Sequence, residues 1–391
     1  MNPRVVIVGA GQAASQAIET LRRRGHTGPI TLIGDEDLLP YQRPPLSKKY
    51  LAGTLDRDRL LIRHADHYLS HGVDLRLGFS AVRIDRERHR VEVADGTSVE
   101  YDRLLIATGS RPRLLPQEWE SVRPFYLRTA MDVELLRREM APGRRAVIIG
   151  GGYIGLESAA TLREAGLEVT VFEAADRVMS RVVSPAVSRF YEAEHARHGV
   201  EIRCRGFYRV PVPGTEIRED FVLGAIGVVP ADSLARDAGL ECDDGILVDE
   251  YCRTSDPHIW AAGDCTRHPS LHYGMRVRLE SVDNAFEQGT SAALNMLGLT
   301  IAHDKVPWFW SDQYDLKMVI VGLAAGFDTA VLRGDPATRA FSVCYLRDGE
   351  LIAVETVNHT KDQMAARKMI PARARPDPRK LADPAIPLRD C

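Results

Sequence analysis

Cysteine is scarce in this sequence, and its cysteines are too far apart to form a paired motif. The 391 residues contain six of them, at Cys204, Cys242, Cys252, Cys265, Cys344 and Cys391. Zinc knuckles, cysteine-ligated iron–sulfur clusters and vicinal redox dithiols all need closely spaced cysteines. The spacing therefore argues against these three kinds of site, and it favours reduced thiols in a cytoplasmic protein.

The sequence also lacks an excess of positive charge and a long apolar run. Its 51 Lys and Arg residues face 54 Asp and Glu residues, whereas proteins that bind the nucleic-acid backbone usually carry a basic excess. The longest apolar stretch, near Ala146–Leu156, is about half of the ~20 residues that a membrane-spanning helix needs. No apolar segment of signal-peptide length follows the N-terminus. We expect a protein with neither a nucleic acid nor a membrane as its partner.

The first recognisable element is a strand, a glycine turn and a helix at the N-terminus. The β-branched run Val5–Val8 predicts a buried parallel strand, a helix is expected over Ala17–Arg24, and a second strand at Ile30–Ile33 completes a βαβ unit. In a dinucleotide-binding turn, two glycines and a small third residue let the backbone approach a pyrophosphate at the helix N-terminus. These positions hold Gly9, Gly11 and Ala14. The carboxylate that accepts from the ribose is then Asp35 or Glu36.

The same unit recurs in the middle of the chain with a stronger match. A strand at Ala146–Ile149 precedes a turn in which all three positions are glycine, namely Gly150, Gly152 and Gly155. The next strand ends at Glu173, whose carboxylate favours a free ribose 2′-hydroxyl and repels a 2′-phosphate. This predicts NADH rather than NADPH, although Arg177 keeps NADPH open as an alternative.

Two dinucleotide-binding units in one chain predict an α/β fold with two Rossmann-like domains. One unit is expected to hold a flavin dinucleotide and the other the nicotinamide nucleotide that reduces it. The 45% hydrophobic and 27% charged composition suits a globular protein of two or three domains. A proline-rich linker near residues 112–124 separates the two units, and the chain becomes strand-rich from residue 305 onward.

Seven short motifs, spread over nearly the whole chain, occur together in a specific order. They are Gly9-Ala10-Gly11, Tyr41 to Lys48 (YQRPPLSK), Ala107-Thr108-Gly109, Gly150 to Glu157 (GGGYIGLE), Ala262 to Cys265 (AGDC), Arg276 to Asn284 (RVRLESVDN) and Pro307 to Gln313 (PWFWSDQ). This set resembles the FAD-dependent ferredoxin reductases of bacterial cytochrome P450 and oxygenase systems.

The resemblance implies a glutathione-reductase-like architecture for the chain. Its FAD-binding domain would be split into residues 1–112 and 231–304, with an NADH-binding domain at 113–230 and a C-terminal α+β interface domain at 305–391. The monomer and the homodimer both remain open as the assembled state. One departure from the family is the segment Cys204–Arg218, which is shorter than its usual counterpart.

The same resemblance implies which residues contact FAD. Those carried over by position or by motif are Ala13, Asp35, Arg43, Lys48, Ala81, Ala107, Thr108, Gly109, Arg128, Gly263, Asp264 and Val282. Lys48 would place a cation near the flavin edge where reduction builds negative charge, its alternative being a solvated surface lysine. Asp264, expected before a helix, would meet the ribityl chain. Val282, in a helix expected to begin around Glu280, would offer its N–H to the flavin.

Further residues are implied for NADH and for electron transfer. Tyr153 and Ile154 complete the second glycine motif, and Glu157 resembles a carboxylate near the nicotinamide, its alternative being a helix-dipole partner. Gly227 would allow close approach to the same ring, or would simply end a strand. Trp310 resembles the aromatic residue near the flavin, the alternative being domain core, which we prefer for Trp308.

The function predicted from these residues is the transfer of electrons from NADH, through FAD, to a separate [2Fe–2S] ferredoxin. The stretch from Tyr41 to Lys48 contains no cysteine, which argues against disulfide reduction, and we expect Cys265 to be packed rather than redox-active. A basic cluster could attract an acidic ferredoxin or be merely solvated; it comprises Arg367, Lys368, Arg373, Arg375, Arg379 and Lys380. The alternatives are a rubredoxin reductase, an NADH oxidase, and an NADH-responsive binding flavoprotein like the apoptosis-inducing factors.

Overall fold

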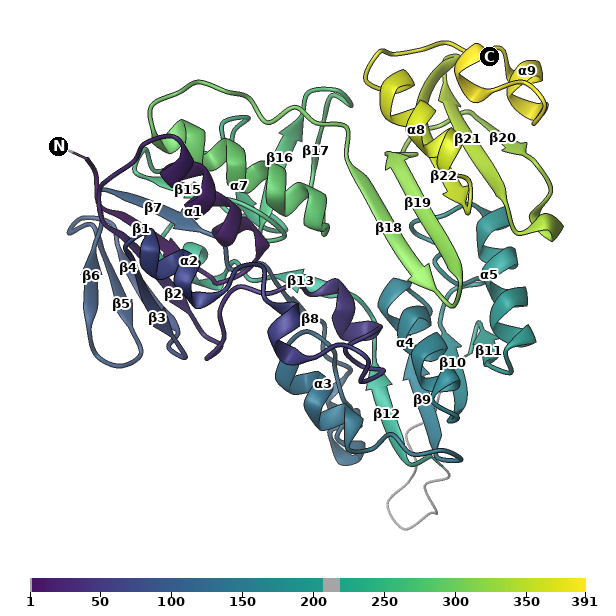
Figure 1. Ribbon diagram of the computed structural model, residues 1–391, viewed down its shortest axis with the longest axis horizontal. Coiled ribbons are helices and arrows are strands. Elements are labelled where there is room, and N and C mark those ends of the chain that lie inside the picture. Colours follow the sequence, from purple (N-terminus) through teal and green to yellow (C-terminus); the bar gives the residue numbers. More distant parts are fainter. Residues whose placement is uncertain (1, 207–218) are drawn as a thin grey trace. The chain divides into compact units, whose positions relative to one another are not determined.

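The computed structural model describes residues 2–206 and 219–391, and the chain divides into two compact units. The first comprises the residues up to Gln42, Asp58–Arg111 and Val229–Lys305, and the second comprises Arg43–Arg57, Pro112–Val228 and Val306–Cys391. The chain order is shown in Figure 1. No helix in the described part of the chain is long and apolar enough to span a membrane. The predicted α/β class is confirmed.

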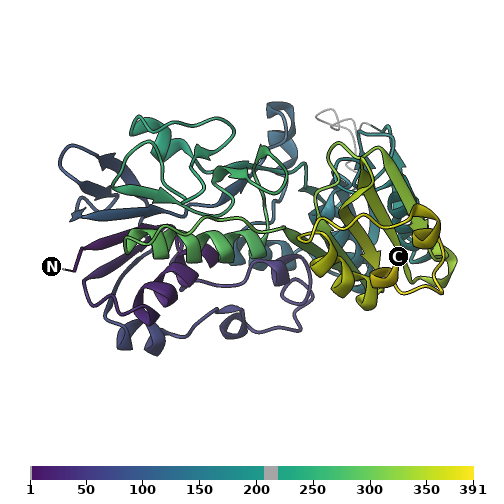
Figure 2. The same cartoon turned by 90° about the horizontal axis from the view of Figure 1, so that it is seen from above.

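A five-stranded parallel sheet forms the centre of the first unit, in the order β15-β7-β1-β2-β3. Its strands are β1 (Val5–Val8), β2 (Ile30–Gly34), β3 (Val73–Leu77), β7 (Arg103–Ile106) and β15 (Ile259–Ala261). All residues of β1 and β2 are buried because both faces of the sheet are covered. Helices α1 (Gln12–Arg23) and α7 (Val282–Met296) pack against each other and run side by side (Figures 1 and 2).

Two predicted helix boundaries in this unit need correction. Helix α1 begins at Gln12 and not at Ala17, because Gly11 is its N-cap and the buried small residues after it already form the first turn. No helix follows Asp264; the next element is strand β16 (Thr266–Ser270). The helix expected around Glu280 begins at Val282, where the hydroxyl of Ser281 accepts from the N–H of Asn284.

The remaining elements that lie wholly or mostly in the first unit are short. They are α2 (Ala65–Ser70), β4 (Ala81–Asp85), β5 (Arg90–Val93), β6 (Ser98–Glu100), β8 (Ser110–Pro112), β13 (Val228–Pro230), α6 (Ser233–Asp237), β14 (Ile246–Leu247) and β17 (Met275–Val277). The single-turn helix η2 spans Arg57–Leu60. Strands β4, β5 and β6 form an antiparallel sheet whose apolar side chains share a core with one face of the parallel sheet.

A four-stranded parallel sheet in the order β11-β10-β9-β12 carries the second glycine turn. It comprises β9 (Arg145–Ile149), β10 (Glu168–Glu173), β11 (Glu201–Cys204) and β12 (Phe221–Gly224), with helices α3 (Ala130–Arg137), α4 (Tyr153–Glu164) and α5 (Pro185–Arg197) and the short 3-10 helix η3 (Gln117–Val122). The single-turn helix η1 (Pro44–Ser47) packs on α4, where the hydroxyl of Thr161 donates to the carbonyl of Ser47 at 2.8 Å. The segment around Lys48 therefore belongs to this unit.

The second unit also contains a five-stranded antiparallel sheet in the order β18-β19-β22-β21-β20 (Figure 1). Its elements are β18 (Trp308–Gln313), β19 (Leu316–Gly322), β20 (Thr329–Arg333), η4 (Pro336–Thr338), β21 (Phe341–Arg347), β22 (Glu350–Val357), α8 (Thr360–Met369), α9 (Pro378–Ala382) and η5 (Leu388–Asp390). Helix α8 covers one face over a core that includes Val321, Val354 and Leu381. The strand-rich pattern expected after residue 305 is confirmed.

Three buried histidines predict a loss of stability in mild acid. Burial lowers the pKa of His195 and of His303 to about 4 and that of His268 to about 3, against ~6.5 in an unfolded chain. The unfolded state therefore binds more protons as the pH falls below about 6.5, and the free energy of unfolding decreases toward pH 4, by up to about 3 kcal/mol for each histidine.

Urea unfolding at pH 7, 6, 5 and 4 measures this loss. Replacing His303 by glutamine should flatten the pH dependence, because one of the buried imidazoles is removed. Replacing His64, which is exposed, should leave the slope unchanged. A free energy of unfolding that stays constant between pH 7 and pH 4 would contradict the prediction.

Candidate functional site

The first glycine turn has the three features that a dinucleotide requires. Gly9 has a positive φ of 104°, and a Cβ there would lie 2.2 Å from the carbonyl oxygen of Ala107. Around Gly11 an added Cβ would meet nothing within 4 Å, so the backbone is open to a close-approaching group. Ala13 and Ala14 are buried in the first turn of α1. The turn therefore fits a pyrophosphate at the helix N-terminus.

The acidic residues after β2 differ in their surroundings. The side chain of Asp35 is exposed, whereas the carboxylate of Glu36 accepts from the hydroxyl of Tyr41 at 2.7 Å. Position 34, directly after the strand core, cannot carry a side chain, because a Cβ on Gly34 would lie 2.6 Å from the Cβ of Ala10. The first carboxylate after β2 is therefore that of Asp35.

Several predicted FAD contacts meet at the carboxyl ends of β1, β7 and β15. These ends align because Val8 pairs with Ile106 and Ile106 pairs with Ala261. The residues that follow β7 and β15 here are Ala107, Thr108, Gly109, Gly263 and Asp264.

Hydrogen bonds hold these residues in place. The hydroxyl of Thr108 donates to the carbonyl of Ala231 at 2.6 Å, and that of Ser110 donates to Asp264 at 2.8 Å. The N–H of Gly263 donates to the side chain of Gln288 at 2.7 Å. Ala81 lies at the start of β4.

The second glycine turn is built in the same way. A Cβ on Gly150 would lie 2.4 Å from the carbonyl oxygen of Ala225, and one on Gly155 would lie 2.0 Å from that of Gly150. Gly152, like Gly11, has open space on its Cβ side. Tyr153 is packed against Phe309 with ring centroids 4.5 Å apart, and Ile154 is 44% exposed. This turn also fits a dinucleotide.

Glu173 is fixed against the second glycine turn by two backbone donors. One carboxylate oxygen accepts from the N–H of Gly151 and the other from the N–H of Ala175, both at 2.7 Å. Gly151 takes the place that Ala10 has in the first turn. A Cβ on Gly151 would lie 3.2 Å from the Cβ of Glu173, so the glycine leaves room for the Glu173 side chain. Because two backbone N–H groups hold it, the carboxylate has a fixed orientation.

Arg177 and Gly227 flank this turn. The guanidinium of Arg177 donates to the carbonyls of Val183 and Ser180 at 2.9 and 2.8 Å, and to the hydroxyl of Ser188 at 2.9 Å. Its hydrogen-bond acceptors thus lie in α5 and in the segment that precedes this helix. Gly227 has a φ of 98°, which favours glycine.

Lys48 and Glu157 form a buried ion pair. The ammonium of Lys48 lies 2.6 Å from Oε2 of Glu157, and their side chains are 18% and 3% exposed. Lys48 is therefore not a solvated surface lysine. A buried pair of this kind is stable only when further hydrogen bonds satisfy its remaining lone pairs.

Two serines supply those hydrogen bonds. The hydroxyl of Ser47 donates to Oε2 of Glu157 at 2.6 Å, and that of Ser311 donates to Oε1 at 2.7 Å. Sequence reasoning missed both serines, although each lies within a motif next to a predicted site residue. The partners of Glu157 are thus side chains from η1 and β18.

The other predicted residues of the second unit lie on nearby elements or on the sheet. Arg43 donates to the carbonyl of Arg128, just before α3. Trp310 stacks on Trp308 at 5.2 Å, and the guanidinium of Arg367 lies 4.0 Å from the centre of the Trp308 ring. Trp308 also packs against the core of the antiparallel sheet.

Cys265, the cysteine next to Asp264, is packed in the core of the first unit. Cys265 is fully buried, its thiol lies 3.4 Å from the carbonyl oxygen of Ala262, and burial raises its pKa to about 11. It is packed as expected, although it precedes a strand rather than a helix. No three His, Cys, Asp or Glu side chains cluster as metal ligands within residues 2–206 and 219–391.

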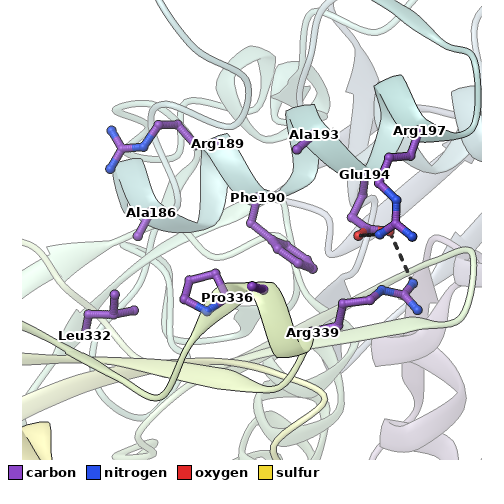
Figure 3. A pocket seen from close by; sticks show the side chains of 10 residues that line it. Ala186, Arg189, Phe190, Ala193, Glu194, Arg197, Leu332, Pro336 and Arg339 are labelled. Carbon is purple, nitrogen blue, oxygen red and sulfur yellow. Dashed lines mark hydrogen bonds and ion pairs between the residues drawn. The ribbon is translucent and has the colours of Figure 1, made fainter.

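A groove of about 410 Å³ lies between α5 and the η4 segment (Figure 3). Phe190 and Pro336 form an apolar part of it, and Arg339 faces Glu194 across it at 3.2 Å. None of the residues predicted for FAD or NADH lines this groove.

Two family models match the chain. Residues 3–289 match the pyridine nucleotide-disulphide oxidoreductases, and residues 308–391 match the reductase C-terminal domain. Rhodocoxin reductase of Rhodococcus erythropolis is 43% identical, over 98% of this chain and 93% of that protein. Putidaredoxin reductase of Pseudomonas putida is 41% identical, over 100% and 96% respectively.

A similar solved structure is a covalent putidaredoxin reductase–putidaredoxin complex, with a TM-score of 0.95 and 40% identity over 99% of this chain and 97% of that one. A ferredoxin reductase for the CYP199A2 system of Rhodopseudomonas palustris gives a TM-score of 0.94, again at 40% identity, over 98% of each chain.

Proposed function

This chain belongs to the pyridine nucleotide-disulphide oxidoreductase family, and we propose that it passes electrons from NADH, through FAD, to a [2Fe–2S] ferredoxin of a cytochrome P450 or dioxygenase system. The family implies FAD and NAD(P) as cofactors. The observation that carries the proposal is the pair of glycine turns, each with an open second glycine at Gly11 and Gly152. The partner class is supported by two similar proteins, the ferredoxin reductase for the CYP199A2 system and the ferredoxin reductase component of an anthranilate 1,2-dioxygenase system.

FAD, when bound, supplies the chemistry that takes up a hydride and releases electrons singly. The chain would hold it by the backbone around Gly11 and by the residues that follow β7 and β15. Gly152 would allow the same approach to NADH, and Glu173 would accept from the ribose hydroxyls. Lys48 would place a positive charge close to where negative charge builds, Glu157 would orient the ammonium of Lys48, and Trp310 would line the flavin.

Glu173 leads us to propose NADH rather than NADPH as the electron donor. A 2′-phosphate would meet the carboxylate, and Arg177, the alternative phosphate ligand, already donates to two carbonyls and a hydroxyl. Replacing Glu173 by alanine should raise the Kd of NADH about tenfold or more and reduce the preference for NADH over NADPH, because charge-assisted hydrogen bonds are lost and a repulsion is removed.

Binding titrations of both nucleotides with each variant measure this. Glu168 lies at the opposite end of β10 and is exposed, so its replacement by alanine is a matched control that should leave both Kd values unchanged. A wild-type protein that binds NADPH as tightly as NADH would contradict the assignment.

The basic cluster is a proposed docking surface for the ferredoxin. Lys368, Arg373, Arg375, Arg379 and Lys380 are exposed on α8, on α9 or between them. Arg373 is partly neutralised by Glu350 at 3.1 Å. Arg367 stacks on Trp308 and so lies next to the Trp308–Trp310 pair. A positive surface would steer an acidic carrier toward this face.

Anaerobic stopped-flow spectroscopy tests the function. The flavin of the holoenzyme should bleach rapidly with NADH, more slowly with NADPH, and should be reoxidised quickly by an oxidised [2Fe–2S] ferredoxin. Preferential reoxidation by rubredoxin or by oxygen would favour those alternatives. Slow bleaching together with an NADH-induced change of oligomeric state would favour a binding flavoprotein.

Several expectations stay predictions. They are the roles of the individual FAD and NADH site residues, the domain boundaries at residues 112, 230 and 304, the cytoplasmic location, and the monomeric or dimeric state. The shortening of Cys204–Arg218 falls largely on residues 207–218, which lie outside the described residues.

A further inference from the structure

The carboxylate of Glu157 is held by unequal partners on its two oxygens. Oε2 accepts from Ser47 and from the ammonium of Lys48, each at 2.6 Å. Oε1 accepts from Ser311 at 2.7 Å. Ser311 is fully buried on β18. The orientation of the carboxylate therefore depends on what holds the hydroxyl of Ser311.

A chain of buried side chains continues from Ser311 to the surface of the second unit. The amide nitrogen of Gln313 lies 3.2 Å from the hydroxyl of Ser311, and its amide oxygen lies 2.9 Å from Nε2 of His195. Nδ1 of His195 lies 3.1 Å from the hydroxyl of Tyr314. Gln313 and His195 are buried, whereas Tyr314 is half-buried.

The acceptor at one end sets the direction of every bond in this chain. A carboxylate can only accept, so Ser311 donates to Glu157 and must itself accept from the amide N–H of Gln313. The amide oxygen then accepts from Nε2–H of His195, and Nδ1 accepts from Tyr314. Burial lowers the pKa of His195 to about 4 and raises that of Tyr314, which agrees with a neutral imidazole and a protonated phenol.

The outer end of the chain is fixed by its neighbours. Tyr314 lies in the turn after β18 and stacks on the exposed His198, with ring centroids 3.7 Å apart. Arg339 forms ion pairs with Glu194 at 3.2 Å and with Asp315 at 2.5 Å. Glu194 directly precedes His195 in the sequence, and Asp315 directly follows Tyr314. Arg339 therefore links the segment that carries His195 to the segment that carries Tyr314. Figure 3 shows the contact of Arg339 with Glu194.

We propose that Ser311, Gln313 and His195 are positioning residues that orient Glu157, and through it Lys48, for the transfer of a hydride from NADH. Each hydrogen bond in this series donates in the direction of Glu157. Hydrogen bonds aligned in this way polarise one another, and this strengthens the bond from Ser311 to the carboxylate. Glu157 is thereby held with its second oxygen toward the ammonium of Lys48. This inference rests on the proposed function, because it assigns these hydrogen-bonded side chains a role in the reduction of the flavin by NADH.

The first test compares two serines in one sheet. Ser311→Ala removes a buried hydroxyl that donates to Glu157, and Ser342→Ala removes a buried hydroxyl that donates to Asp362 at 2.9 Å. In single-turnover reduction of the holoenzyme by NADH, Ser311→Ala should lower the limiting rate about tenfold or more, with less than about a twofold change in the Kd of NADH. Reoxidation by ferredoxin should be unchanged, and Ser342→Ala should resemble the wild type.

A second variant removes the donor without creating a cavity. In Gln313→Glu the carboxylate presents an acceptor to Ser311, so the serine hydroxyl is drawn away from Glu157, and reduction should slow as in Ser311→Ala. An independent readout, which needs no turnover, is the imidazole of His195 in nitrogen-15 NMR spectra at pH 7. It should be neutral, with the proton on Nε2.

The outcomes separate this proposal from the proposed function. A wild-type enzyme that oxidises NADH and reduces ferredoxin, with Ser311→Ala and Gln313→Glu as fast as the wild type, would overturn the positioning role alone. A proton on Nδ1 of His195 would contradict the inferred direction of the hydrogen bonds from Tyr314 to Glu157. A wild-type holoenzyme that NADH does not reduce would instead overturn the proposed function.

Discussion

Glu157→Gln is expected to slow the reduction of the flavin by NADH about a hundredfold and to destabilise the protein by about 3 kcal/mol or more. The wild-type carboxylate accepts from Ser47, Lys48 and Ser311. A glutamine presents one acceptor oxygen and one amide donor to these three donors, and it leaves the ammonium of Lys48 without its counterion in a largely buried place. Removal of one partner of a buried ion pair usually costs about 3–5 kcal/mol.

A second buried ion pair of the same unit supplies the control. Arg333 lies 2.8 Å from Asp362, and both side chains are 3% exposed. Asp362→Asn should lower the free energy of unfolding by a similar amount. It should leave the reduction rate unchanged, because Asp362 contacts elements near the C-terminus and none of the proposed cofactor residues. The measurements are urea unfolding and stopped-flow reduction of each variant.

The double variant Lys48→Met with Glu157→Gln separates the stabilising role of the pair from its proposed role in catalysis. It should recover part of the lost stability, since no unpaired charge is buried, and it should remain slow in reduction. A double variant that regains the wild-type rate would show that the pair serves only the fold.

The second large effect is expected at two glycines of one turn, with opposite consequences. A Cβ at position 155 would lie 2.0 Å from the backbone oxygen of Gly150, which cannot move without breaking the turn. We therefore expect Gly155→Ala to lower the free energy of unfolding by about 4 kcal/mol or more. A Cβ at position 152 meets nothing within 4 Å, so Gly152→Ala should fold with nearly unchanged stability.

Gly152→Ala should nevertheless weaken NADH binding about tenfold or more. The added methyl group enters the space through which the backbone would approach the pyrophosphate. The same change at the first turn, Gly11→Ala, should leave the affinity for NADH unaltered and reduce the retention of FAD. Isothermal titration with NADH, the flavin content after purification and thermal unfolding together check these outcomes. Tight NADH binding by Gly152→Ala would contradict the proposed site.

Local patterns were sufficient for much of the fold. The β-branched run at Val5–Val8 predicted β1, and the two glycine turns predicted where each βαβ unit begins. Local patterns failed at two boundaries. The buried first turn of α1 has little amphipathic signal, so its start at Gln12 was missed, and Asp264 was assigned to a helix start although a strand follows.

The chain's own sequence determined the residue types that the proposed chemistry needs and their place relative to each turn, because strand, turn and helix signals are local. Only the tertiary structure decided which of these residues act on one another. Ser47, Glu157 and Ser311 lie on η1, α4 and β18, more than a hundred residues apart from one to the next, and no periodicity relates them. Their hydrogen bonds arise from the packing of three separate elements around one buried carboxylate, which must find donors wherever the fold brings them.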